Sequence, residues 1–223
     1  PAFNESEKIE EIINRIKKKS DNIIICNDGS TDSTGEIAKK MGVIVIDHKK
    51  NLGYGSAIKS IFLKAKEIEA DILITFDADG QHRIQDIDKV IQPILDNNAD
   101  IVIGSRFLEN DVEMPKYRKF GVKTITRLTN ISSEIKLSDS QSGFRAYNKK
   151  ILSEIVPTEN GMGISTEIII KANREKLRIK EVPITILYEG KTSTHNPIVH
   201  GISVILSTTK FISTEHPLAF YGI

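Results

Sequence analysis

Two aspartates separated by one residue, Asp77 and Asp79, are the side chains in this sequence best placed to bind a metal ion. They directly follow the apolar run 72–76, as residues at the end of a buried strand would. Carboxylate oxygens suit Mg²⁺ or Mn²⁺, and such ions usually keep waters and hold substrate phosphates. The pair therefore predicts a divalent cation site, with Gln81 near enough in sequence to assist. An Asp-x-Asp also arises by chance, so the position after a strand is what gives this one weight.

Arginines are the second group of residues suited to chemistry. Four of them lie in one segment: Arg106, Arg118, Arg127 and Arg145. The planar guanidinium matches the geometry of phosphate oxygens. A cation site followed by such a segment suggests a diphosphate on one side and a second anion on the other. Salt bridges on a helix surface are the alternative explanation, and they account best for Arg127.

A glycine-rich stretch at 51–57 precedes an expected helix and is a weaker candidate for phosphate binding. Residues 47–50 separate it from the preceding strand, so a dinucleotide-binding loop is not predicted. The sequence also contains neither a P-loop motif nor the Gly-x-Ser-x-Gly motif of serine hydrolases.

The elements that must position these residues alternate along the first half of the chain. Apolar runs predict strands near 23–26, 43–46, 71–76 and 101–103, and helical patterns cover 9–16, 33–41, 56–69 and 84–95. Asn4, Glu5 and Ser6 are expected to cap the first helix. Alternation of this kind predicts a mostly parallel α/β sheet with helices on both faces. Polar residues such as Asp28 and Asp77 would then lie at the carboxyl ends of the strands, where ligands bind.

The second half of the chain is less regular. Helices are expected at 117–131 and 166–175, a short strand at 143–147, and extended chain at 177–187. The stretch 197–212 has the pattern of an amphipathic helix, which would lie on a membrane surface or, alternatively, pack against the domain. An apolar stripe with a polar face favours the membrane surface. We predict one α/β domain over 1–196 and a C-terminal appendage over 197–223.

Composition excludes several classes of protein. The chain has 223 residues, 39% of them hydrophobic, which is typical of a folded domain rather than a disordered chain. Lys and Arg number 31 against 30 Asp and Glu, so the net charge of +1 does not suggest a nucleic-acid binder. One cysteine, Cys26, permits neither an intrachain disulfide nor a cysteine zinc cluster. No apolar run is long enough to span a bilayer.

Taken in order, the motifs resemble those of the inverting family-two glycosyltransferases, which have the Rossmann-like GT-A fold. The matching stretches are 1–5 (PAFNE), 27–32 (NDGSTD), 51–55 (NLGYG), 76–82 (FDADGQH) and 104–107 (GSRF). The stretch 140–145 (SQSGFR) extends the match toward the polyprenyl-phosphate branch, typified by dolichyl-phosphate mannose and glucose synthases. In that branch a strand precedes the first motif, and an amphipathic helix leads into membrane helices; the given sequence contains neither that strand nor those helices.

The resemblance implies a role for each motif. Residues expected around the nucleotide-sugar are Pro1, Ala2, Asn4, Glu5, Asp28, Gly29, Ser30, Asn51, Gly53, Asp77 and Ala78. Asp28 would bind the base and Asp77 the ribose or the metal. Asp79, with Gln81, would hold Mg²⁺ or Mn²⁺ on the donor diphosphate and so act in catalysis.

The acceptor decides which further residues act. A phosphate monoester is already anionic near neutral pH, so it needs cations rather than a general base. The cations available are Arg106, Arg118, Arg145 and Lys191. Their presence favours transfer of a single sugar to a polyprenyl phosphate at the cytoplasmic face of a membrane. A hydroxyl acceptor on a glycan or a lipid is the alternative, and Asp139 would then be the base.

The sequence also bears on two other functions. A processive polysaccharide synthase is not predicted, because that branch carries a Gln-x-x-Arg-Trp signature and this chain has no tryptophan. A non-catalytic module that only binds a nucleotide-sugar is a third possibility. The presence of Asp77, Asp79 and Arg106 argues against such a module, because a chain that had lost catalysis would not be expected to retain all three.

Overall fold

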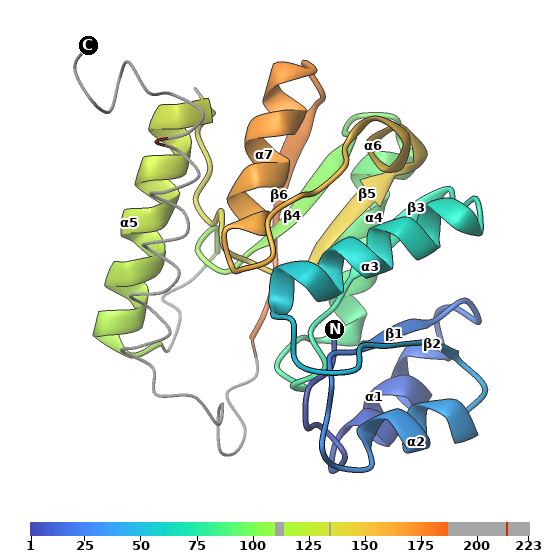
Figure 1. Cartoon of the computed structure of the whole chain (residues 1–223). Helices are drawn as coiled ribbons and strands as arrows, with labels where there is room; N and C mark the ends of the chain where they lie inside the picture. Colours follow the sequence, from blue (N-terminus) through green and yellow to red (C-terminus); the bar gives the residue numbers. More distant parts are fainter. Residues whose placement is uncertain (110–113, 134, 187–212, 214–223) are drawn as a thin grey trace.

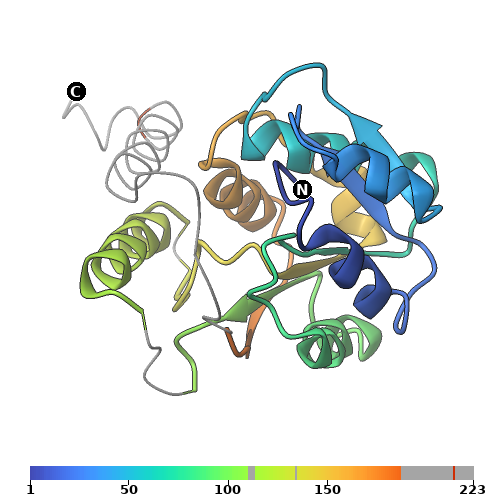
Figure 2. The ribbon, with the colours of Figure 1, turned by 90° about the horizontal axis from the view of Figure 1, so that it is seen from below.

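The computed structural model describes residues 1–109, 114–133, 135–186 and 213. These residues form two β-sheets with helices packed around them, as Figures 1 and 2 show. Lys191 and the expected amphipathic helix at 197–212 lie outside the described residues. None of the helices in the described part of the chain is long and apolar enough to cross a bilayer.

The smaller sheet holds two parallel strands, β1 (Ile24–Asn27) and β2 (Ile44–Asp47). Helix α2 (Thr34–Lys40) connects them. Helix α1 (Ile9–Ile16) packs its predicted apolar face, which includes Ile9 and Ile13, against this part of the core. The prediction that residues 4–6 cap α1 is wrong. The helix begins after Lys8 with no side-chain cap, because the Asn4 side chain accepts a hydrogen bond from the Thr31 backbone instead.

The larger sheet has the strand order β3-β5-β4-β6. Its strands are β3 (Ile72–Thr75), β4 (Ile101–Ser105), β5 (Arg145–Asn148) and β6 (Ile179–Pro183). Strand β4 is parallel to β6, and β5 runs antiparallel to both of its neighbours. The predicted α/β fold is confirmed. The reversed direction of β5 was not predicted, and it brings the start of β5 to the same edge as the ends of β3 and β4.

Helices cover both faces of the larger sheet. Alternate residues of β4 point to opposite faces, so Ile101 and Ile103 join one core while Val102 joins the other. The first core includes residues of α3 (Tyr54–Glu67), α6 (Lys149–Glu154) and α7 (Ile164–Arg174). A 3₁₀ turn (Ile84–Asp86) and α4 (Ile87–Leu95) cover the second. Helix α6 was not predicted from the sequence.

Helix α5 (Lys116–Ser133) lies at the edge of the molecule beside α7, far from β1 and β2 (Figures 1 and 2). Its buried residues are Ile125, Thr126, Thr129 and Ser133. The side chains of Thr129 and Thr166 approach to 3.3 Å, and Asn173 donates to the Ser133 carbonyl. These contacts fix one face of α5 on α7.

An apolar cavity of about 560 Å³ lies between β1 and β3, which are not paired within the described residues. Its lining includes Ile24, Ile25, Ile72 and Ile74. Ala2 runs parallel to β1 at its end, donating to the Cys26 carbonyl and accepting from the Asp28 amide. The residues expected to act lie outside this cavity, at the ends of the strands.

Candidate functional site

The polar residues expected to act together lie at one edge of the larger sheet. Thr75, at the end of β3, pairs with Arg145 at the start of β5, and Arg145 pairs with Ile103 near the end of β4. Asp77 and Asp79 follow β3, and Arg106 follows β4. The topology therefore brings the two carboxylates, Arg106 and the loop 138–144 to one place.

The two carboxylates after β3 differ in their surroundings. Burial opposes ionisation of Asp77, but its contact with His82, 3.4 Å from its Oδ2, lowers the pKa of Asp77 below its usual value. Burial and the charge of Asp77 raise the pKa of Asp79. The Asp79 carboxylate accepts a hydrogen bond from the Gln81 amide, and its backbone carbonyl accepts one from Lys8. The two acids thus repel each other in a half-enclosed site.

That repulsion fits a divalent cation, which would offset it, and the oxygen donors are those that Mg²⁺ and Mn²⁺ prefer. The described residues contain no group of three or more His, Cys, Asp or Glu side chains arranged to hold a metal. A cation at Asp77 and Asp79 would therefore complete its coordination with water and substrate oxygens, as Mg²⁺ commonly does.

Gly143 holds the loop before β5 against Asp77. A Cβ atom at this position would lie 2.5 Å from Asp77 Oδ2 and 2.9 Å from the Tyr54 hydroxyl. Such distances are far inside van der Waals contact, so any larger side chain must displace the carboxylate. The motif 140–145 contains Gly143 but does not by itself reveal this close approach.

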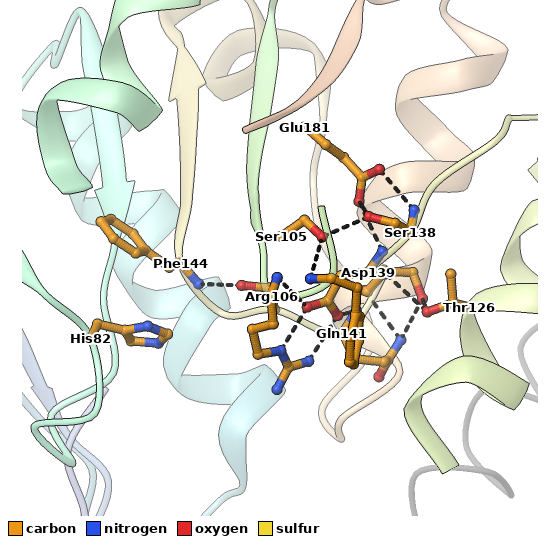
Figure 3. Close-up of polar contacts among 12 residues, drawn as sticks. His82, Ser105, Arg106, Thr126, Ser138, Asp139, Gln141, Phe144 and Glu181 are labelled. Carbon is orange, nitrogen blue, oxygen red and sulfur yellow. Dashed lines mark hydrogen bonds and ion pairs between the residues drawn. The ribbon is translucent and has the colours of Figure 1, made fainter. Parts of the chain in front are cut away.

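His82 lies in an aromatic pocket beside Asp77. Its ring packs edge-on against Phe76, with ring centroids 5.3 Å apart. The centroid of the Phe144 ring lies 5.2 Å from that of His82, and Figure 3 shows these two residues. The ring is buried, and its Nδ1 atom has no hydrogen-bond partner within the described structure. The packing orients Nε2 toward Asp77.

Arg106 and Asp139 form a buried ion pair that was not predicted (Figure 3). Asp139 is fully buried and accepts from Arg106 Nε at 2.6 Å, from Arg106 Nη2 at 2.8 Å and from the Arg106 amide at 3.2 Å. Burial opposes ionisation, but the Arg106 charge and these hydrogen bonds hold the pKa of Asp139 below its usual value. A carboxylate held in this way is a weak base.

Glu181 on β6 holds the loop that carries Asp139. Its carboxylate accepts hydrogen bonds from the Ser138 and Asp139 amides at 2.7 and 2.8 Å, and from the Ser138 hydroxyl (Figure 3). The Ser138 and Ser105 hydroxyls are 2.6 Å apart. Strands β4 and β6 are thus linked through this loop to the Arg106–Asp139 pair.

Arg145 does not face the site as expected. Its side chain is 1% exposed and donates to three backbone carbonyls, those of Ser140, Ser142 and Ser165. It therefore fixes the loop before β5 to the start of α7. Because its donors point into the protein, nothing in this geometry supports its predicted contact with an acceptor phosphate. Arg118 lies in the exposed first turn of α5, and Lys191 lies outside the described residues.

The residues expected around the nucleotide come together at the end of β1. The Asn4 side-chain oxygen accepts a hydrogen bond from the Thr31 backbone N–H, and the Asn4 backbone N–H donates to the Ser30 hydroxyl. The Glu5 backbone N–H donates to the Thr34 hydroxyl. Burial, opposed by Lys8, raises the pKa of Glu5 to about 7. Hydrogen bonds thus hold the N-terminal segment 1–6 against the segment 28–34.

Asp28 has a structural role at this point. The carboxylate is buried, lies 2.6 Å from His48 Nδ1, and accepts from the Leu52 and Gly53 amides. Gly29, with φ of 71°, lies so close to residues 50–51 that a Cβ would sit 2.2 Å from the Lys50 carbonyl carbon. These contacts bring Asn51 and Gly53 beside the turn 28–30. Contact of Asp28 with a base stays a prediction.

Glu167 is a further buried carboxylate that sequence analysis missed. It accepts from the Thr158 amide and hydroxyl, from the Glu159 amide and from Lys171. Gly55 at the start of α3 packs on the same loop, where a Cβ would lie 2.5 Å from the Gly161 carbonyl oxygen. Glu167 lies one turn before Lys171 on α7. This spacing of four residues is the only feature of the sequence that indicates the ion pair between them.

Comparison with known proteins agrees with this arrangement. The model of the family described as Glycosyl transferase family 2 matches residues 1–156. The chain belongs to glycosyl transferase family 2, and it is a glycosyltransferase. The matched segment contains Asp77, Asp79, Arg106 and Asp139, and so most of the candidate site.

Two archaeal relatives match nearly the whole chain. A UDP-N-acetylglucosamine–dolichyl-phosphate N-acetylglucosaminyltransferase of Methanococcus voltae is 39% identical, over 92% of this chain and 89% of the relative. A dolichyl-phosphate hexose transferase of Haloferax volcanii is 29% identical, over 96% of this chain and 92% of the relative.

A solved structure has the same fold. It is glucosyl-3-phosphoglycerate synthase of Mycobacterium tuberculosis with Mn²⁺ and UDP-glucose, with a TM-score of 0.73 and 19% identity, covering 95% of this chain and 76% of the other. At this identity the likeness establishes the GT-A fold alone.

Proposed function

We propose that this glycosyltransferase moves one sugar from a nucleotide-diphosphate sugar to a polyprenyl phosphate, with inversion, at the cytoplasmic face of a membrane. The observation that carries the proposal is the convergence of Asp77, Asp79 and the Arg106–Asp139 pair at one sheet edge. A cation held by the two carboxylates would then share this sheet edge with a guanidinium that Asp139 holds in place. The names of the two archaeal relatives support the acceptor.

The donor would lie across the ends of β1 and β3. Asp77 and Asp79, with Gln81, would hold Mg²⁺ or Mn²⁺, which supplies Lewis-acid neutralisation of the leaving diphosphate when bound. The segment 1–5 and the turn 28–30 would bind the nucleotide, with the loop 51–53 beside them. Hydrogen bonds between these segments already fix them without ligand, which lowers the ordering cost of binding.

The acceptor phosphate would be positioned by Arg106 and Arg118, with Lys191 as a further cation. Asp139 orients the Arg106 fork, and the two-point contact fixes its plane. Arg145 is left out of this set because its donors are used within the fold. A phosphate monoester attacks as an anion, so no residue need remove a proton from it.

A hydroxyl acceptor would require a general base, and Asp139 was the residue expected to serve. Its pairing with Arg106 and lowered pKa make it a poor base near neutral pH. The geometry therefore favours the phosphate acceptor over the hydroxyl.

Calorimetric titration tests the donor side of the proposal. UDP-glucose, UDP-N-acetylglucosamine and GDP-mannose would each be titrated with and without Mn²⁺. We expect metal-dependent binding of one donor, lost in Asp79→Asn and retained in Asp71→Asn, whose side chain is 91% exposed. Equal binding with and without metal, or unchanged binding by Asp79→Asn, would refute the cation site.

A further inference from the structure

His48 joins three polar side chains beside the turn 28–30. Its ring lies 2.6 Å from Asp28 Oδ1 through Nδ1, and 2.9 Å from the Ser60 hydroxyl through Nε2. The Cys26 Sγ atom lies 3.6 Å from the same Nε2. The side chains of His48 and Asp28 are only 10% and 6% exposed. Strand β1, the end of β2 and helix α3 each contribute to this group, so no local pattern in the sequence indicates it.

These contacts establish which ring nitrogen donates to Asp28. A carboxylate only accepts hydrogen bonds, so the Nδ1 atom of His48 carries the hydrogen that faces Asp28. In a neutral ring Nε2 is then the acceptor, and the Ser60 hydroxyl donates to it. Ser60 therefore holds the imidazole in the tautomer and orientation that direct Nδ1–H toward the carboxylate.

The same three groups, in the same order, form the catalytic triad of serine hydrolases, but they do not make a nucleophile here. Ser60 lies in the interior of α3, where each backbone N–H donates to a carbonyl one turn earlier. The N–H groups of α3 around Ser60 are therefore not available to stabilise an oxyanion, as acyl transfer requires. The arrangement holds Asp28 in place rather than activating Ser60.

The two oxygens of Asp28 are engaged unequally. Oδ1 accepts from His48 and, at 2.9 Å, from the Leu52 backbone N–H. Oδ2 accepts from the Gly53 backbone N–H at 2.9 Å. Each carboxylate oxygen has two lone pairs. Within the described residues, both lone pairs of Oδ1 are thus engaged and Oδ2 has one left. Because His48 engages Oδ1, the acceptor that Asp28 offers to a ligand is on Oδ2.

The surroundings of Asp28 suit a flat ring with an N–H on its edge. Asp28 follows β1, at the end of the strand where ligands bind in sheets of this kind. Leu52, whose backbone N–H binds the carboxylate, is itself 46% exposed. An apolar side chain beside one acceptor matches a nucleobase, whose faces are apolar and whose edge is polar. A base without a donor at that edge would leave the buried acceptor unpaired, which costs affinity.

We propose that His48 is a positioning residue which, held by Ser60, fixes Asp28 so that its remaining acceptor selects a nucleobase with a ring N–H. Uracil carries this hydrogen at N3 and guanine at N1, whereas cytosine N3 and adenine N1 are bare acceptors. The inference rests on the proposed function and deepens it. It assigns selection of the donor's base to a residue that acts only through Asp28.

Titration of four nucleoside diphosphates tests this role. UDP, CDP, GDP and ADP would each be titrated into the full chain, with and without Mn²⁺. With Mn²⁺, the wild type should bind UDP more tightly than CDP, or GDP more tightly than ADP, by about tenfold or more. His48→Leu should reduce this ratio to about twofold or less, because the freed carboxylate can rotate and bind water. His48→Asn has nearly the same shape as His48→Leu but retains an N–H near the position of Nδ1, so it should keep most of the ratio.

A histidine that only supported packing would behave differently. His48→Leu would then weaken all four diphosphates alike and leave the ratio unchanged, and this outcome would overturn the proposal. A wild type that discriminates within neither pair would also overturn it. Thermal unfolding would establish that both variants are folded.

Nuclear magnetic resonance of the wild-type imidazoles gives a second test that does not depend on the variants. The Nδ1 atom of His48 should be protonated, and its signal should shift when the preferred diphosphate binds. A hydrogen on Nε2 alone would overturn the proposal. Metal-dependent nucleotide binding with a ratio untouched by His48→Leu would refute the role of His48 while leaving the proposed function intact. Absence of binding by all four diphosphates would refute both.

Discussion

Individual side chains at the sheet edge are held by contacts that leave little room for substitution. Asp77 lies between His82 on one side and the backbone of Gly143 on the other. Asp139 and Arg106 hold each other in place, and the Arg145 guanidinium donates its hydrogen bonds to backbone carbonyls. Chemistry at this site therefore depends on residues that themselves touch no substrate.

Gly143→Ala should disrupt the cation site through one added methyl group. Its Cβ would lie 2.5 Å from Asp77 Oδ2, so the carboxylate must move. We expect metal-dependent donor binding to weaken by about tenfold or more, measured by calorimetry, since ligand geometry governs metal affinity. Gly121→Ala is the control, because a Cβ there meets nothing within 4 Å. Equal donor binding by both variants would show that Asp77 is not confined as described.

Glu181→Gln tests the support of the Arg106–Asp139 pair. In the wild type, the two oxygens of Glu181 accept from the backbone N–H groups of Ser138 and Asp139. In the variant, the side-chain NH₂ group would face one of these N–H donors. That donor would lose its acceptor, so the loop 138–139 should shift. We expect turnover with acceptor to fall by about tenfold or more while donor affinity stays near the wild-type value. Steady-state kinetics with both substrates varied would measure this. Lys180→Gln, exposed on the same strand, should change neither quantity, and a loss of donor affinity in Glu181→Gln would contradict the assignment.

Among the elements, β4 and β6 are joined at their starts by a charged clamp. Asp100 accepts from the Arg178 amide and guanidinium and from the Asn148 side chain. Hydrogen bonds from Arg178, only partly opposed by burial, lower the pKa of Asp100 to about 2. The clamp joins three neighbouring strands β5, β4 and β6 at the edge opposite the site.

A carboxyl whose pKa is lower in the folded than in the unfolded protein adds stability at pH values above its unfolded-state pKa. This contribution is lost as the pH falls toward its folded-state pKa. For Asp100 the loss should therefore occur between about pH 5 and pH 2. At neutral pH, Asp100→Asn should lower the free energy of unfolding by about 1–2 kcal/mol, because Arg178 is half-exposed and solvent screens the pair.

Urea unfolding at pH 7 and pH 3 would measure this difference. The gap between wild type and Asp100→Asn should shrink at the lower pH. Asp71→Asn, altered at an exposed carboxylate, should follow the wild type at both values. A gap that stays constant with pH would show that the ionised clamp is not what stabilises the strand starts.

Local patterns predicted most elements, because each depends on residues near one another in the chain. The apolar runs before Asp28, Asp77 and Arg106 identified strands β1, β3 and β4, and the alternation with helices predicted the α/β fold. Helical spacing of Ile9, Ile12 and Ile13 likewise identified α1. The element limits moved by only a few residues.

Contacts between residues far apart in the sequence could not be predicted. An Arg that faces a phosphate and one that binds backbone carbonyls, as Arg145 does, have the same local sequence. The Arg106–Asp139 pair joins residues 33 positions apart, and Glu181 joins β6 to a loop more than 40 positions earlier. The direction of β5 likewise depends on pairing with β3 and β4, which the run 145–148 does not encode by itself.

At the scale of the whole molecule, the proposed donor and acceptor sides are separate parts. The β1–β2 region with the segment 1–6 forms the nucleotide side, and α5 lies at the far edge (Figure 1). The end of β3 and the loop 138–144 lie between them. This layout suits a reaction that joins a water-soluble donor to an acceptor held in a lipid surface.

The most direct test of this account is a transfer assay with two acceptors that differ by one group. The donor identified by calorimetry would be incubated with a polyprenyl phosphate and, in parallel, with the corresponding free polyprenol, in the presence of Mn²⁺. The account predicts a sugar-linked lipid from the phosphate only, and none from Asp79→Asn. Transfer to the free alcohol, or to neither lipid by protein that binds the donor, would contradict it.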